Sequence, residues 1–198
     1  MGENTTFRII VSIIVLVSLS ISIYFRRKAQ KNSQDEIDRR LEGNFTMIAL
    51  RFGGILIWLI IFAYILYPAA ISWATVPLPS WMRWSGVAGS AAAALLLVWM
   101  FTSLGLNITD SVTTRDEHNL ITKGPYRWIR HPLYTFGLLL FLCLSLIMGT
   151  WLIPILGIPT FAILIHRTGI EERTLQERFC DEYQRYTEQT GRFFPRLG

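Results

Sequence analysis

The sequence is poor in charge, and this shortage excludes most soluble globular folds. Only 17% of its 198 residues are charged, whereas 52% are hydrophobic. Soluble domains usually have about a quarter of their residues charged. The charges also occur in blocks between long apolar runs. The composition therefore predicts a helical membrane protein in which a single domain, residues 1–198, accounts for the whole chain.

Cysteine and histidine are also scarce, with two and three residues respectively. Cys143 lies in an apolar run and Cys180 in a charged tail, so neither belongs to a spaced ligand motif. We therefore expect no metal. The formal net charge is +5, but the Lys and Arg residues flank apolar runs, which is typical of membrane topology rather than of nucleic-acid binding.

Three long apolar runs predict three membrane helices within residues 1–106. They cover residues 7–25, 47–73 and 81–106. At about 1.5 Å per residue, each run is close to or above the length needed to cross a bilayer core of about 30 Å. The third run contains small residues, among them Gly86 and Gly89, and these would let a neighbouring helix approach closely.

Residues 107–198 contain two polar blocks that are separated by a shorter apolar hairpin, residues 134–165. Its two arms, 134–148 and 151–165, are joined at Gly149-Thr150. The predicted fold is thus an all-α integral membrane protein with about five transmembrane helices. The last two helices form the hairpin, and a cytoplasmic, helical C-terminal region would bind a cofactor. We take 107–198 as the catalytic region.

The distribution of Lys and Arg predicts the orientation. Residues 26–47 contain six, residues 107–133 contain four and the tail after residue 165 contains six, whereas the loop 74–80 contains none. Because cytoplasmic loops carry the excess of Lys and Arg, the N-terminus is expected outside. Both polar blocks and the C-terminus of this multi-pass protein are then expected in the cytoplasm.

The segment 123–134 places charge, aromatic rings and a histidine at a predicted membrane boundary. Such residues are costly there unless they line a cavity or a wet interface. Pro132 would lie in the first turn of the next helix, where proline is tolerated, and a helix N-terminus offers N–H groups that suit a carboxylate. His131 and Tyr134 would add side-chain donors, so the site suits an amino-acid-like ligand.

The second polar block contains Arg167 and Glu171, which are four residues apart and share one face of a continuous helix. Glu171 could hold an ammonium or sulfonium group, and Arg167 could hold an anionic substrate. Taken alone, the pair is more typical of an ordinary surface ion pair at a helix exit than of a binding site.

Together, the two blocks resemble the isoprenylcysteine carboxyl methyltransferase family and its relatives, which include phospholipid N-methyltransferases. The first block shares with that family His118, Leu120, Ile121, Gly124, Tyr126, Arg130, His131, Pro132, Tyr134 and, one residue late, Gly137. The second shares Arg167, Glu171, Glu172, Leu175, Phe179, Tyr183, Tyr186 and Pro195. The sequence departs from the family pattern at Cys180, where glycine often follows the Phe.

The resemblance implies S-adenosylmethionine as methyl donor and S-adenosylhomocysteine as product. Arg167 and Glu171 would be the catalytic residues, with Arg167 binding the substrate carboxylate. The implied cofactor-binding residues are His118, Asn119, Leu120, Ile121, Tyr126, His131, Pro132, Leu133, Tyr134 and Glu171.

The resemblance also implies an amphipathic or lipidated methyl acceptor in contact with membrane lipids, with a carboxylate as the methylated group, as in prenylcysteine. Three alternatives stay open at this point. The acceptor could be the amine of a phospholipid or another molecule. The protein could be a membrane reductase that uses NADPH. It could also be a non-enzymatic membrane protein whose basic tail meets anionic lipids.

Overall fold

The computed structural model describes residues 2–31, 44–104 and 120–196, and these fold into helices. The α-helices are α1 (Glu3–Lys31), α2 (Asn44–Leu66), α3 (Ser80–Leu104), α4 (Pro132–Met148) and α5 (Leu152–Gln189), and the 3-10 helices are η2 (Pro68–Ala74) and η3 (Gly124–Arg127). Within the described residues, extended pairing is limited to two isolated bridges. The all-helical class predicted from the sequence is therefore confirmed.

Four helices of the described part are long and apolar enough to cross a membrane. These are α1 through Glu3–Phe25, α2 through Thr46–Leu66, α3 and α5. Helix α4 is apolar but has only 17 residues. The prediction of several membrane helices is confirmed at this level.

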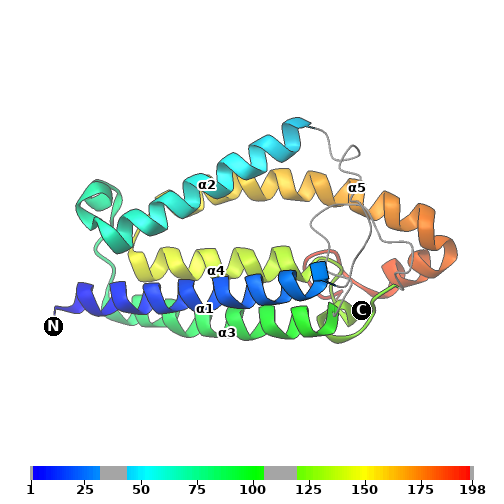
Figure 1. Ribbon diagram of the computed structural model, residues 1–198, viewed down its shortest axis with the longest axis horizontal. Coiled ribbons are helices and arrows are strands. Elements are labelled where there is room, and N and C mark those ends of the chain that lie inside the picture. Colours follow the sequence, from blue (N-terminus) through cyan, green and yellow to red (C-terminus); the bar gives the residue numbers. More distant parts are fainter. Residues whose placement is uncertain (1, 32–43, 105–119, 197–198) are drawn as a thin grey trace.

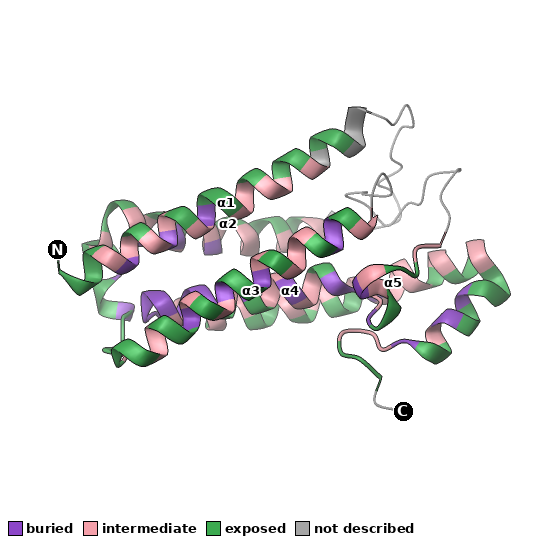
Figure 2. Ribbon diagram, turned by 90° about the horizontal axis from the view of Figure 1, so that it is seen from below, coloured by how far each residue is buried: buried purple, intermediate pink, exposed green. Residues whose placement is uncertain are grey.

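The helices lie side by side and successive helices reverse direction, so that the described parts of the two polar blocks reach the same end of the bundle (Figure 1). Helix α3 packs most extensively on α4, and α2 packs on α5. Buried residues lie mainly where helices face one another, whereas the outward faces are exposed (Figure 2). The largest buried cluster includes Ile57 and Ile61 of α2, Leu144 and Ile147 of α4, and Ile153 of α5.

The close approach of α3 to α4 depends on two glycines, as the sequence predicted. A Cβ atom at Gly86 would lie 2.8 Å from the backbone oxygen of Cys143, and one at Gly89 would lie 2.5 Å from the Cys143 sulfur. Real Cβ contacts are longer than this, so a larger residue would push the helices apart. The small residues of α3 therefore serve a contact within the chain.

Helix α2 ends at Leu66, whereas the sequence predicted an apolar helix as far as residue 73. Pro68 lacks a backbone N–H and cannot continue the hydrogen-bond ladder. It instead occupies the start of η2, where a missing N–H costs nothing. The predicted second span was therefore too long, because its last residues form the separate 3-10 helix η2.

The predicted hairpin is present, but its second arm is longer than expected. Gly149 ends α4 in the left-handed conformation with φ 65°, and the N–H of Thr150 donates to the carbonyl of Ser145. This is the usual way in which a glycine terminates a helix. Helix α5 then continues beyond the apolar arm as far as a kink at Cys180, so Arg167, Glu171 and Glu172 lie on the same helix as the membrane arm. Only Cys180, with φ 43° and ψ −117°, interrupts it.

Two arginines hold the helices together at the end opposite the polar blocks, a role that the sequence did not reveal. The Arg83 guanidinium donates to the Ile147 carbonyl at the end of α4 (2.8 Å), to Asn4 Oδ1 (2.8 Å) and to the Tyr64 hydroxyl (3.2 Å). Arg8 donates in the same way to the Ile65 carbonyl near the end of α2 (2.6 Å). Cations at helix C-termini are favourable because the last carbonyls lack partners.

Candidate active site

Two neighbouring carboxylates of α5, Glu171 and Glu172, meet the segment that leads into α4. Helix α5 presents them beyond its apolar part, which ends at Ile165. The Pro132 ring starts α4 and leaves His131 just before the helix, where it is 8% exposed. Buried charges need partners, and the two carboxylates lie within ion-pair distance of the basic residues around them.

Glu172 forms ion pairs with three basic side chains. Its Oε1 atom lies 2.9 Å from Arg130 Nε and 3.1 Å from His131 Nε2, and its Oε2 atom lies 2.9 Å from an Arg192 nitrogen. Burial alone would raise the pKa of Glu172, but the hydrogen bonds from His131 and Arg130 outweigh it and lower the pKa to about 2. Glu172 is therefore a fixed anion at neutral pH.

Glu171 is surrounded by a different set of donors. The Tyr134 hydroxyl donates to Glu171 Oε1 (2.7 Å), Arg167 Nε lies 3.4 Å from the same oxygen, and His131 Nδ1 lies 3.4 Å from Oε2. The side chains of Glu171 and Arg167 are 16% and 15% exposed. The i,i+4 spacing of Arg167 and Glu171 thus produces the shared face that the sequence predicted.

His131 lies between the two carboxylates, with one ring nitrogen toward each. A protonated imidazole can donate from both nitrogens, so this arrangement favours the cationic form of the ring. Burial lowers the pKa of His131, but the hydrogen bonds to Glu171 and Glu172 outweigh burial and raise it. The Tyr134 ring stacks on the imidazole at a centroid distance of 5.7 Å.

The segment after α5 closes over this cluster. The N–H groups of Arg130 and His131 donate to the carbonyls of Gly191 and Arg192 (2.9 and 3.1 Å). The Thr135 hydroxyl donates to the Phe193 carbonyl (2.9 Å), and the Phe193 ring packs against His131. The end of the chain therefore forms one wall of the site.

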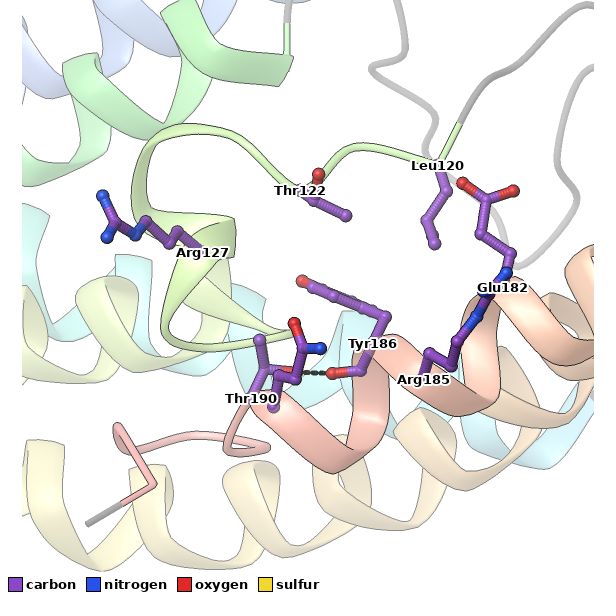
Figure 3. Close-up of a pocket in the computed structure, with 8 residues that line it drawn as sticks. Leu120, Thr122, Arg127, Glu182, Arg185, Tyr186 and Thr190 are labelled. Carbon is purple, nitrogen blue, oxygen red and sulfur yellow. Dashed lines mark hydrogen bonds between the residues drawn. The ribbon is translucent and has the colours of Figure 1, made fainter. Parts of the chain in front are cut away.

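A polar cavity of about 380 Å³ lies beside the cluster, between residues 120–127 and the last turns of α5 (Figure 3). Tyr186 and Thr190 form its floor, and the Tyr186 hydroxyl donates to the Tyr126 carbonyl (2.7 Å). Thr190 also connects the cavity to the cluster, because its carbonyl accepts a hydrogen bond from Arg130 (2.5 Å). The lining residues are Leu120, Thr122, Arg127, Glu182, Arg185, Tyr186, Gln189 and Thr190.

The residues expected to bind the cofactor divide into three groups. One group forms the cluster itself: His131, Pro132, Tyr134 and Glu171, joined by the predicted substrate residue Arg167. A second group lies near the cluster. Leu120 lines the cavity, and Ile121 is the next residue in the sequence. Tyr126 packs against the apolar cluster that contains Ile129 and Phe136, and the Leu133 side chain is exposed. The last, His118 and Asn119, lies outside the described residues.

Sequence reasoning missed the basic residues around Glu172. Arg130 was part of the motif but had no assigned role, and Arg192 was not singled out at all. Arg192 is 20 residues from Glu172 along the chain, and the kink of α5 at Cys180 together with the turn after Thr190 brings them together. No local pattern could have found this pair.

The fold and the cluster define a helical membrane protein with a charged site at one end of its bundle. Residues 87–177 match the model of the isoprenylcysteine carboxyl methyltransferase (ICMT) family. This range contains α4, His131, Arg167 and both glutamates. This match covers a little less than half of the chain, and it agrees with the family resemblance that the motifs predicted.

Similarity to individual proteins is lower and partial. The chain is 35% identical over 89 residues to the cobalt-zinc-cadmium resistance protein CzcN of Cupriavidus metallidurans. The matched residues make up 43% of this chain and 40% of CzcN. It is 29% identical over 100 residues to the uncharacterized protein YpbQ of Bacillus subtilis, covering 50% of this chain and 58% of YpbQ.

A solved structure shares the fold. The eukaryotic intramembrane Ras methyltransferase ICMT superposes with a TM-score of 0.56 at 18% identity, over 92% of this chain and 66% of that one. The chain thus spans less than two thirds of each of these three proteins.

Proposed function

We propose that this protein is a membrane-embedded, S-adenosylmethionine-dependent methyltransferase that acts on the carboxylate of an amphipathic, lipid-like molecule. The observation that carries the proposal is the position of the Glu171 carboxylate. Helix α5 brings it to the start of α4, where it contacts His131, Tyr134 and Arg167. Lys and Arg counts favour a cytoplasmic site and an external N-terminus.

The chemistry of the site residues fits S-adenosylmethionine. Glu171 supplies a negative charge for a sulfonium or ammonium group, and the start of α4 at Pro132 suits a carboxylate. Leu120 and the ring of Tyr186 border a cavity that suits a nucleoside. When bound, the cofactor would supply an electrophilic methyl group. The residues of this chain would bind and orient both reactants.

A carboxylate acceptor is favoured over an amine because Arg167 can hold it by charge and because its methylation releases no proton. An ammonium group must lose a proton before it can accept a methyl group, and an efficient base has a pKa near the working pH. Glu172 has a pKa of about 2, and Glu171 already receives the Tyr134 hydroxyl. A carboxylate needs no base, and Arg167 would hold it by charge.

The position of Arg167 also suits an acceptor with an apolar tail. Arg167 is two residues beyond Ile165, the last residue of the apolar part of α5, and Ile165 is 39% exposed. A lipid-like molecule could therefore leave its tail beside α5 while its head group reaches the arginine. Limited exposure of the cluster restricts water, and fixed positions of both reactants supply much of the catalysis.

Calorimetric titration of the detergent-purified protein with S-adenosylhomocysteine tests the proposal. We expect saturable binding that Glu171→Gln weakens at least tenfold. Glu177→Gln, an exposed glutamate of the same helix, is the matched control and should bind as the wild type does. Absence of binding to the folded wild type would overturn the proposal, and stabilisation by NADPH instead would favour a reductase.

A further inference from the structure

His131 lies between two carboxylates, one of which faces the proposed cofactor, and this position suits more than a part in a cofactor pocket. We propose that His131 distinguishes the methyl donor from the product: it releases its proton when a sulfonium binds at Glu171 and keeps it when the thioether binds. This inference rests on the proposed function and names the residue that sets its ligand preference.

The geometry makes His131 and the sulfonium competitors for the same carboxylate. His131 Nδ1 lies 3.4 Å from Glu171 Oε2, and the other oxygen of Glu171 is already engaged by the Tyr134 hydroxyl. A cation that reaches Glu171 must therefore approach the imidazolium, which is 8% exposed. Two like charges at close range in a site with little water repel strongly.

The charges of the whole cluster point in the same direction. Three arginines and the imidazolium face two carboxylates, so the site carries two net positive charges before any ligand binds. The charged and titratable groups that face His131 are Arg130 before α4, Tyr134 of α4, Arg167, Glu171 and Glu172 of α5, and Arg192 of the final segment. S-Adenosylmethionine adds one positive charge, whereas S-adenosylhomocysteine adds none.

Of these groups, His131 is the one suited to release a proton near neutral pH. Arginine stays protonated in proteins, and Glu172 is already ionised. Histidine has an ordinary pKa of about 6.5, and hydrogen bonds to both glutamates raise the pKa of His131, which favours a protonated ring before ligand binds. After methyl transfer the neutral product leaves the site free to recover the proton from solvent.

Calorimetry in paired buffers of different ionisation enthalpy counts this proton directly. Wild-type protein is titrated with S-adenosylmethionine and, separately, with S-adenosylhomocysteine between pH 6 and 8.5. We expect release of a proton on binding the donor and none on binding the product. The preference for the donor should rise with pH, by up to about tenfold per pH unit, the limit for one linked proton.

Two variants locate the proton. His131→Asn should abolish the release, and His166→Asn, an exposed histidine of α5, should preserve it. Equal proton counts for the two ligands in the wild type would overturn the inference and leave the proposed function standing. Binding of neither ligand would overturn the proposed function and the inference with it. The wild-type comparison decides the question even if His131→Asn does not fold.

Discussion

Replacement of Glu172 by Gln should destabilise the protein more than any other conservative change in the site. Gln keeps the shape of the side chain but removes the negative charge that Arg130, His131 and Arg192 share. These three cations would then face one another in a site where Glu172 is only 19% exposed. Removing one partner of a buried ion pair costs about 3–5 kcal/mol.

The pKa of Glu172 gives an independent magnitude. A carboxyl group whose pKa falls from 4.5 to about 2 on folding stabilises the folded state by about 3 kcal/mol at neutral pH. Because the cluster is partly exposed, we expect Glu172→Gln to cost about 2–3 kcal/mol. Since the folded pKa is the lower one, this stabilisation is present above pH 4.5 and is lost as the pH falls toward 2.

Unfolding by a denaturing detergent, followed by tryptophan fluorescence at pH 7 and pH 4, measures this difference. The gap between wild type and Glu172→Gln should be largest at pH 7 and should shrink in acid. Glu177→Gln, on the exposed face of α5, should change stability by less than about 0.5 kcal/mol. A loss for Glu172→Gln no larger than for this control would refute the assigned ion-pair network.

Three further predictions concern the helix bundle. Arg83→Met removes hydrogen bonds to α1, α2 and α4 and should cost about 2–4 kcal/mol, measured by the same detergent unfolding; a change below about 0.5 kcal/mol would contradict its role. Cys180→Gly should stabilise by about 0.5–1 kcal/mol, because φ 43° strains any side chain, whereas Cys180→Ala should bring no gain. Gly86→Ala should lower the free energy of unfolding by about 1–3 kcal/mol, because the added Cβ meets the Cys143 backbone. Gly54→Ala should be tolerated, because there is open space around Gly54. Equal effects of the two substitutions would argue against close α3–α4 packing.

Hydropathy was sufficient to predict the helical class and most helix positions. Runs of apolar residues fix where helices form, because backbone groups in lipid must be paired within the segment. Proline and glycine then set the ends, as at Pro68 and Gly149. The length of α5 was less predictable, because its polar half has no hydropathy signal and continues the helix of its apolar half.

The candidate site was predicted where its residues are close in sequence or belong to one motif. His131 and Tyr134 flank the start of α4, and Arg167 and Glu171 share a helix face, so local periodicity brings each pair together. Arg192 could not be predicted, because its contact with Glu172 depends on how the chain turns at Cys180 and again after α5. Arg83 was missed for the same reason, since its partners belong to three other helices.

Cys180 shows how a departure from a sequence pattern acquires a physical meaning. The sequence indicated that related proteins often have glycine after the Phe, and the structure places Cys180 at a positive φ that glycine adopts without strain. The departure thus leaves the site contacts intact and is expected to lower stability.

A crystal structure of the protein grown with S-adenosylhomocysteine tests the central claim most directly. The account predicts that the ligand lies at the start of α4, with its sulfur beside Glu171 and Tyr134 and its adenosine toward Leu120 and Tyr186. A ligand bound away from Glu171, or a site that stays empty at saturating ligand concentration, would contradict the account.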